Sequence, residues 1–308
     1  MSSSGASAPS PDSSATPLKG ILIAMVAAML FASTHSAVRL LSDHMSAFEI
    51  VFWRMAVSMA LLTPYYGWKG FHHLQTRRLG MHVQRSALNF IGMILWFYAL
   101  ARVPLAKAVA IHFTLPLFVL VLAALVLGER VGMRRIGATA VGFCGVLVIL
   151  QPGVEAVGIE EGMILCSAAL YGATVIYLKK MVDTETPLAM TFYTNAFICL
   201  FSIPPAIWFW VSPQVDDILP IAVIGVLGTL APFLLTTALR TTDASVIAPI
   251  DFLRLPFTAA IAFALFGEVP EIWVWVGGGI IFFSTYYITV RENRLARERR
   301  MAEAAGEA

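Results

Sequence analysis

Two stretches of the chain resemble each other: ALARVPLAKAVAIHFTLPLFVLVLAALVLGE at Ala99–Glu129 and ALRTTDASVIAPIDFLRLPFTAAIAFALFGE at Ala238–Glu268. A shift of 139 positions (238 − 99) superposes the Ala-Leu pair that opens each stretch and the Gly-Glu pair that closes it. The midpoint proline recurs as Pro116 and Pro256, one residue out of step. A long apolar segment with the same beginning and end, repeated at about half the chain length, indicates an internal duplication.

The composition indicates a membrane protein. Of the 308 residues, 58% are hydrophobic and 13% are charged, whereas soluble domains carry about 25% charged residues. The apolar residues come in runs of about twenty, the length that crosses roughly 30 Å of hydrocarbon as a helix. Because these runs are unbroken rather than alternating, they favour helices as the spanning structure. We therefore predict an all-α polytopic membrane protein.

Ten transmembrane helices are expected, five in each copy of the duplication. We place them at residues 18–41, 48–67, 79–101, 104–127, 131–150, 159–179, 187–210, 217–239, 244–266 and 270–290. The chain then divides into an N-terminal tail (1–17), a first five-helix repeat (18–153), a second five-helix repeat (154–292) and a cytoplasmic C-terminal tail (293–308). The N-terminal tail is rich in Ser, Ala and Pro, which predicts disorder. Small residues such as Gly145 and Gly277 predict close helix contact for the fifth and tenth spans.

The charges of the loops predict how the chain crosses the membrane. Lys and Arg collect in the loops on one side and in the C-terminal tail, whereas the opposite loops are acidic and hold one basic residue, Arg102. Because basic loops stay in the cytoplasm, both termini are expected there, as an even number of spans requires. Each half has an odd number of spans, so the second half enters the membrane from the other face. Inverted repeats of this kind are typical of secondary transporters, which bind substrate near the midplane between the halves.

Ionisable side chains inside the spans are the candidate functional residues. Each costs roughly 2.5–3.5 kcal/mol on insertion scales and usually faces a cavity or a partner. They are His35 and Arg39 in the first span, Arg54 in the second, Lys107 and His112 in the fourth, and Asp251 and Arg254 in the ninth. The shift of 139 positions gives His112 and Asp251 equivalent midplane positions in the two halves. This pair is the sharpest prediction for the substrate site.

Basic groups predominate in this set, which suits a substrate that carries carboxylates or another anionic group. Trp96 is expected to offer a ring face to the ligand, with packing as the alternative. Lys107 is equally well explained as an anchor at the membrane interface. For Asp251 and Arg254, the alternative is a salt bridge that neutralises both residues.

Motifs for other chemistry are missing from the sequence. It contains no GxxxxGK[ST], HExxH or GxSxG, and the single cysteines Cys144, Cys166 and Cys199 predict buried thiols rather than a disulfide or a metal site. We expect no catalytic residue, no metal, no cofactor and no nucleic acid partner. The expected partners are a small-molecule substrate, a coupling proton or other ion, and the lipid bilayer, with a homodimer as an open alternative.

Five segments, in order, carry a resemblance to a known family: FEIVFWRMA (48–56), WFYALARVPLAKAVAIHFTLPLFV (96–119), LGERVGMRRIGATAVGFCGVLVILQPG (127–153), DASVIAPIDFLRLPFTAAIAFALFGEVP (243–270) and YYITVRE (286–292). The chain resembles EamA-type transporters of the drug/metabolite transporter superfamily over nearly all of residues 18–292. The resemblance implies ten helices in an inverted five-plus-five arrangement, with a central cavity lined mainly by spans 1–4 and 6–9. It also implies that Arg54 and the Asp251–Arg254 pair occupy the family's cavity positions. His35 and Arg39 stand where related members often have an acid and a lysine, so the substrate of a relative does not transfer directly.

These observations together predict a secondary transporter of the bacterial inner membrane for a small polar metabolite. The basic cavity favours export of an amino-acid-like or multiply carboxylated compound, for example an opine-type metallophore. One alternative is import of a vitamin or nucleoside-type metabolite such as riboflavin or S-adenosylmethionine. An alternative of another class is a membrane enzyme or accessory subunit that transports nothing.

Overall fold

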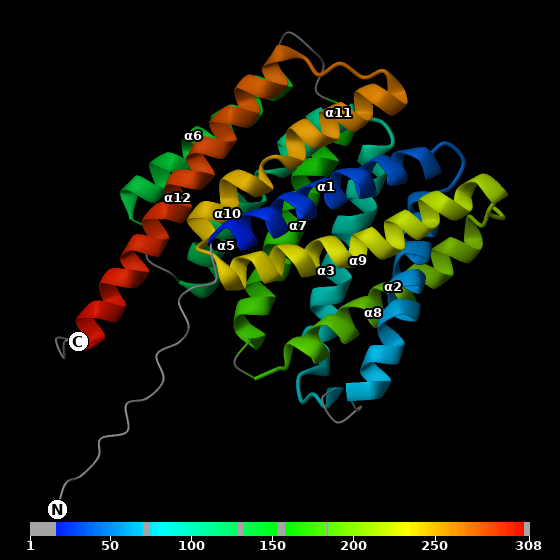
Figure 1. Ribbon diagram of the computed structural model, residues 1–308, viewed down its shortest axis with the longest axis horizontal. Coiled ribbons are helices and arrows are strands. Elements are labelled where there is room, and N and C mark those ends of the chain that lie inside the picture. The colour runs from blue at the N-terminus through cyan, green and yellow to red at the C-terminus, as the bar shows by residue number, and fades with distance from the viewer. Residues whose placement is uncertain (1–16, 70–73, 129–131, 153–157, 183, 305–308) are drawn as a thin grey trace, which may run out of the picture.

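The computed structural model describes residues 17–69, 74–128, 132–152, 158–182 and 184–304, which fold as a bundle of α-helices (Figure 1). The first repeat contains α1 (Pro17–Leu41), α2 (Ala47–Lys69), α3 (Leu79–Leu100), α4 (Leu105–His112), α5 (Leu115–Leu127) and α6 (Met133–Leu150). The second contains α7 (Ile159–Met181), α8 (Pro187–Trp208), the short 3₁₀ helix η2 (Val215–Asp217), α9 (Ile218–Thr241), α10 (Ala244–Asp251), α11 (Arg254–Phe266) and α12 (Ile272–Ala304).

The described helices make ten membrane spans, which confirms the prediction of an all-α polytopic protein. Nine helical segments of the described chain are long and apolar enough to cross a membrane, and two of these consist of a pair of helices, α4 with α5 and α10 with α11. The tenth span is α3, whose 22 residues have the required length but include the polar side chains of His82, Arg85 and Asn89. We call the side of the molecule where α1 begins and α12 ends the terminal face, and the other side the opposite face.

The packing of the helices follows the internal duplication. α1 lies against α9 of the other repeat, and the equivalent helices α7 and α3 pack in the same way. α1 also packs on α11, as α7 packs on α5, whereas α2 pairs with its own equivalent α8 and α6 with its own equivalent α12 (Figure 1). The two repeats therefore interleave, and most elements of one repeat rest on the other.

The fourth span of each repeat is broken at the same position. α4 ends at His112 and α5 begins at Leu115, and the shift of 139 positions carries these residues onto Asp251 and Arg254, where α10 ends and α11 begins. The sequence analysis predicted one continuous span at 104–127 and another at 244–266. The structure instead has two half-helices in each span, so two helix ends lie in the middle of the membrane in each repeat.

A proline follows each break and weakens the helix there. Pro116 and Pro256 have no N–H group, so each leaves the carbonyl four residues earlier without its helical donor. Around the first break the backbone tightens, and Thr114 N–H donates to the Ile111 carbonyl at 3.1 Å. The rings of Phe113 and Phe252, which the 139-residue shift relates to each other, lie with their centroids 4.5 Å apart. Equivalent residues of two inverted repeats meet only near the axis that relates the repeats, so this axis passes beside the breaks.

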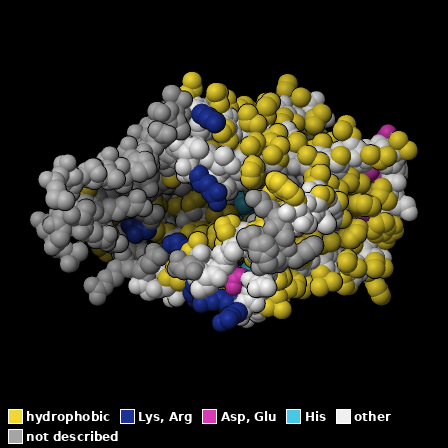
Figure 2. All heavy atoms as spheres, turned by 60° about the horizontal axis from the view of Figure 1, so that its bottom comes forward, with side chains coloured by type: hydrophobic (Ala, Val, Ile, Leu, Met, Phe, Trp, Pro, Cys, Tyr) yellow, Lys and Arg dark blue, Asp and Glu magenta, His cyan; other side chains and the backbone are white. Residues whose placement is uncertain are grey.

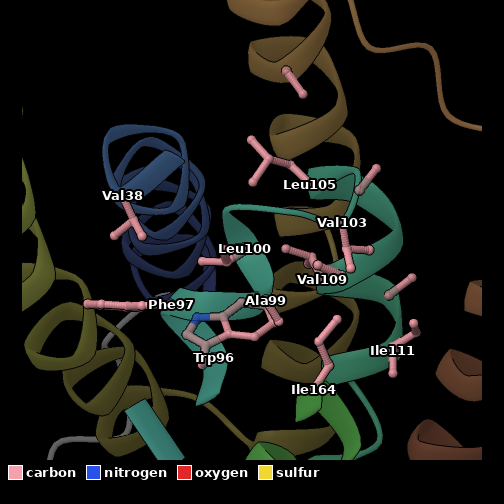
Figure 3. Close-up of a cluster of buried hydrophobic side chains, with 14 of the residues drawn as sticks. Val38, Trp96, Phe97, Ala99, Leu100, Val103, Leu105, Val109, Ile111 and Ile164 are labelled. Carbon is pink, nitrogen blue, oxygen red and sulfur yellow. The ribbon is translucent and has the colours of Figure 1, made fainter. Parts of the chain in front are cut away.

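The hydrophobic core fixes the helices around this axis. Trp96, Leu100 and Leu105 belong to one cluster of buried side chains that joins the end of α3 and the start of α4 to α1 and α7 (Figure 3). Val38 of α1 and Ile164 of α7 complete the cluster on its two sides. The core therefore holds Trp96 in place from the side away from the terminal face.

The periphery of the bundle departs from the expectation for the cysteines. Cys144 and Cys166 are exposed and Cys199 is half-buried, so the prediction of buried thiols is wrong, because apolar side chains in a spanning helix can face lipid as well as the protein core. α12 continues to Ala304, so most of the segment assigned to a C-terminal tail (293–308) extends the last helix. Residues 1–16 of the predicted N-terminal tail lie outside the described residues.

Candidate functional site

A cavity of about 290 Å³ lies in the middle of the bundle, beside the two breaks. Five of the predicted site residues line it, each from a different helix, namely His35, Arg54, Trp96, His112 and Arg254. The second repeat adds Thr194 and Asn195 of α8 and Gly228 of α9, among others. Seen from the bottom of Figure 1, where α2 ends and α3 and α8 begin, the molecule is hollowed, with Lys and Arg side chains around the hollow (Figure 2). The hollow therefore opens to the terminal face.

Arg54 is held in the cavity by neutral groups. Its Nη2 donates to the carbonyl oxygen of Gly228 at 3.0 Å, and its Nη1 lies 3.4 Å from the sulfur of Met93. None of the residues that line the cavity in the described chain is Asp or Glu. The charge of Arg54 is thus met by dipoles rather than by a carboxylate, which leaves it available to an electron-rich group of a ligand.

Arg254 both lines the cavity and pairs with Asp251, the two alternatives that the sequence left open. Its guanidinium lines the cavity, and its Nη2 also lies 2.5 Å from Oδ1 of Asp251. The guanidinium carbon is 4.2 Å from the ring centroid of Phe31 and 5.4 Å from that of Phe113, within the range of cation–π contact. Asp251 itself does not line this cavity but faces a neighbouring one.

Four rings form a row along one wall of the cavity. The centroid of His35 lies 5.3 Å from that of Trp96, Trp96 lies 4.3 Å from His112, and His112 lies 5.6 Å from Tyr171. Nδ1 of His35, Nε2 of His112 and Oδ1 of Asn89 are buried and have no hydrogen-bond partner among the described residues. Because buried polar atoms are normally satisfied, these three atoms are candidates to bind a polar ligand that stacks on the rings.

Two predicted site residues lie elsewhere. Arg39 pairs with Glu268 at 3.3 Å, and Glu268 also accepts the N–H of Leu105 at 2.8 Å. Lys107 pairs with Glu161 at 3.2 Å. These contacts join α1, α4, α7 and the end of α11 near the opposite face, so Arg39 and Lys107 take part in closing that face and do not line the cavity.

The internal duplication could have identified the cavity residues that the sequence analysis missed. The shift of 139 positions carries Asn89 onto Gly228, and aligning the starts of α2 and α8 sets Arg54 against Thr194. Thr194 also accepts a hydrogen bond from Nη1 of Arg85 at 2.7 Å. A polar residue that lines the cavity in one repeat therefore predicts that its equivalent in the other repeat also lines the cavity, even where that equivalent is small or uncharged.

Comparison with known proteins agrees with this architecture. The model of the EamA-like transporter family matches residues 18–151 and again residues 159–290. An S-adenosylmethionine uptake transporter of Rickettsia bellii (strain RML369-C) is 32% identical over 254 residues, which are 82% of this chain and 87% of the relative. A riboflavin transporter of Vibrio cholerae is 29% identical over 289 residues, which are 92% of this chain and 97% of the relative.

One solved crystal structure superposes with a TM-score of 0.62 at 16% identity and covers 90% of this chain and 99% of its own. At that identity the likeness supports the fold alone. The two family matches coincide with the two interleaved repeats, each with its broken fourth span. The chain therefore belongs to the EamA-like transporter family.

Proposed function

We propose that this transporter takes up a planar metabolite of the riboflavin type, uncharged or anionic, across the bacterial inner membrane. The observation that carries the proposal is the cavity wall, which combines a row of rings with Arg54 and Arg254 and contains no carboxylate in its described lining. Flat heterocycles stack on such rings, and their carbonyl oxygens accept hydrogen bonds from guanidinium groups.

The S-adenosylmethionine uptake transporter among the relatives favours uptake over the export of an opine-type compound, which the basic residues alone suggested. One relative is a riboflavin transporter and another an S-adenosylmethionine uptake transporter. S-adenosylmethionine carries a fixed positive charge on its sulfonium, which Arg54 would repel, because Arg54 contacts only neutral groups and no carboxylate lines the described cavity. The charge of the cavity therefore favours the flavin-type substrate.

In this proposal both termini lie in the cytoplasm, as the basic loops predict, and the hollow at the terminal face is the cytoplasmic opening. Transport then requires the contacts near the opposite face, such as Arg39 with Glu268, to open while the hollow closes. Asn89 and the two histidines would bind the polar groups of the substrate between these two states.

Uptake of radiolabelled riboflavin into proteoliposomes tests the proposal, with unlabelled S-adenosylmethionine and an opine-type dicarboxylate as competitors. We expect saturable uptake that neither competitor inhibits. The variant Arg54→Gln removes charge-assisted hydrogen bonds worth about 1.5–3 kcal/mol, so KM should rise about ten- to a hundredfold. Arg102→Gln, the same change at an exposed arginine that contacts Tyr98, is the control. Absence of riboflavin uptake by the inserted wild-type protein, or equal uptake by Arg54→Gln, would contradict the proposal.

A further inference from the structure

A second cavity, of about 230 Å³, lies beside the substrate cavity between α9, α10 and α12. Asp251 lines it next to the break in the ninth span, at mid-membrane depth. Leu239 near the end of α9 and Ala244 at the start of α10 line its other end. Because both of these residues lie toward the terminal face, the cavity extends from Asp251 toward that face.

One wall of this second cavity carries hydroxyl groups. Thr285, Tyr286 and Thr289 of α12 line it, and Oγ1 of Thr285 is buried without a hydrogen-bond partner among the described residues. A hydroxyl both donates and accepts hydrogen bonds, so it can order water that passes a proton along the cavity. The 139-residue shift relates Thr285 to Val146 and Thr289 to Leu150. The first repeat has apolar residues at these positions, so the hydroxyl groups are a feature of the second repeat.

The Asp251–Arg254 ion pair connects the two cavities, because Asp251 lines the second cavity and Arg254 lines the substrate cavity. Asp251 is the last residue of α10 and Arg254 is the first residue of α11. A helix dipole is negative at its C-terminal end and positive at its N-terminal end, so each charge stands at the unfavourable end of its own half-helix. The pair offsets this cost only while the two side chains remain in contact.

Few other charged groups surround the pair. Of the helices packed against α10, α12 presents the phenol of Tyr286, whereas α9 presents Leu235 and α1 presents Ala24. The imidazoles of His35 and His112 lie across the substrate cavity, on the side of Arg254. Asp251 therefore depends on Arg254 for charge compensation.

We propose that Asp251 is the binding site of the coupling proton and that the chain is a proton symporter. The inference rests on the proposed function in one respect: the substrate must carry an oxygen atom that Arg254 binds. When Arg254 turns to that oxygen on the periplasmic side, its contact with Asp251 breaks, and the carboxylate takes one proton from periplasmic water to become a carboxylic acid. On the cytoplasmic side the acid returns the proton to water in the second cavity, which extends toward the terminal face, Arg254 pairs with Asp251 again, and the substrate leaves. One proton thus moves with each substrate molecule.

The first experiment needs no substrate. Arg254→Gln leaves Asp251 without its partner, so the infrared spectrum of the purified variant at neutral pH should show the C=O stretch of a protonated carboxylic acid that the wild-type spectrum lacks. The double variant Arg254→Gln/Asp251→Asn should lose this band. A spectrum of Arg254→Gln without the additional band overturns the inference, whatever the transported compound is.

The second experiment uses riboflavin in proteoliposomes with an imposed pH gradient. Wild-type protein should accumulate riboflavin on the alkaline side, at equilibrium about tenfold for each unit of pH gradient. Uptake by Asp251→Asn should be the same with and without the gradient, whereas Asp216→Asn, the same change at an exposed carboxylate, should behave as wild type. Gradient-driven accumulation by Asp251→Asn overturns the inference. A wild-type protein that does not carry riboflavin at all contradicts the proposed substrate, and the infrared result then decides on the proton site.

Discussion

Replacing Gly228 by alanine tests the position of Arg54 without touching its charge. A Cβ atom at residue 228 would lie 2.7 Å from Nε of Arg54 and 3.4 Å from Nη2, and the first of these distances is shorter than real contacts allow. The clash is with the far end of a flexible side chain, so the helix can form and the guanidinium moves instead. It then loses the 3.0 Å hydrogen bond to the carbonyl of residue 228. The displaced guanidinium also loses its charge-assisted hydrogen bond to the substrate, worth about 1.5–3 kcal/mol, which corresponds to about ten- to a hundredfold in affinity.

The assay is the KM for riboflavin uptake in proteoliposomes. We expect Gly228→Ala to raise KM toward the value of Arg54→Gln, with thermal stability equal to wild type or slightly higher, because alanine favours a helix over glycine by about 0.5–1 kcal/mol. Gly279→Ala is the matched control, since a Cβ at that position meets no atom within 4 Å. An unchanged KM in Gly228→Ala, with a raised KM in Arg54→Gln, would refute the reasoning that Arg54 binds substrate from its present position.

Two predictions concern stability, measured by thermal unfolding of the purified protein in detergent. Glu185→Ala should destabilise the protein by about 1–3 kcal/mol, because Glu185 and His82 are buried and lie 3.2 Å apart; an unchanged transition temperature would contradict this. Gly145→Val should cost about 1–3 kcal/mol through overpacking, because a Cβ there would lie 2.7 Å from the backbone oxygen of Gly277. Gly137→Ala on the same helix meets no neighbour and should leave the transition temperature unchanged or raise it.

The sequence was sufficient to predict the number and type of the spanning segments, because few secondary structures are stable in lipid. Unbroken apolar runs in a membrane must be helices, and the recurrence of the Ala99–Glu129 stretch at Ala238–Glu268 identified two repeats. The sequence analysis did not foresee that the fourth and ninth spans are broken. Pro116 and Pro256 were visible, but a proline in a spanning helix can kink it as well as end it. Which of the two occurs depends on the packing of rings such as Phe113 against the other repeat.

The candidate site was predicted in part, because charge alone does not reveal which residues have an ion-pair partner in the other repeat. The ionisable side chains inside the spans identified seven candidate positions, but their charge could not separate Arg54, which faces the cavity, from Arg39, which pairs with Glu268. The partner Glu268 belongs to the other repeat, 229 positions away (268 − 39), so no local pattern reveals it. Thr194 and Gly228 carry no charge and were missed for that reason, although their positions follow from the duplication.

The duplication also relates two contacts at opposite faces, and their state bears on how the protein opens. His44, in the turn between α1 and α2, lies 2.9 Å from Asp217 at the start of α9. The equivalent turn between α7 and α8 holds Glu185, which contacts His82 in the first turn of α3, the equivalent of α9. In the first contact the imidazole lies in the turn and the carboxylate lies at the start of the helix, and in the second contact these positions are reversed. Equivalent elements of the two repeats meet in both contacts. Both contacts are formed in a structure whose hollow opens to the terminal face (Figure 2). A gate would be open at one face and closed at the other, whereas these two contacts are formed at both faces, so they fasten the repeats to each other rather than act as gates.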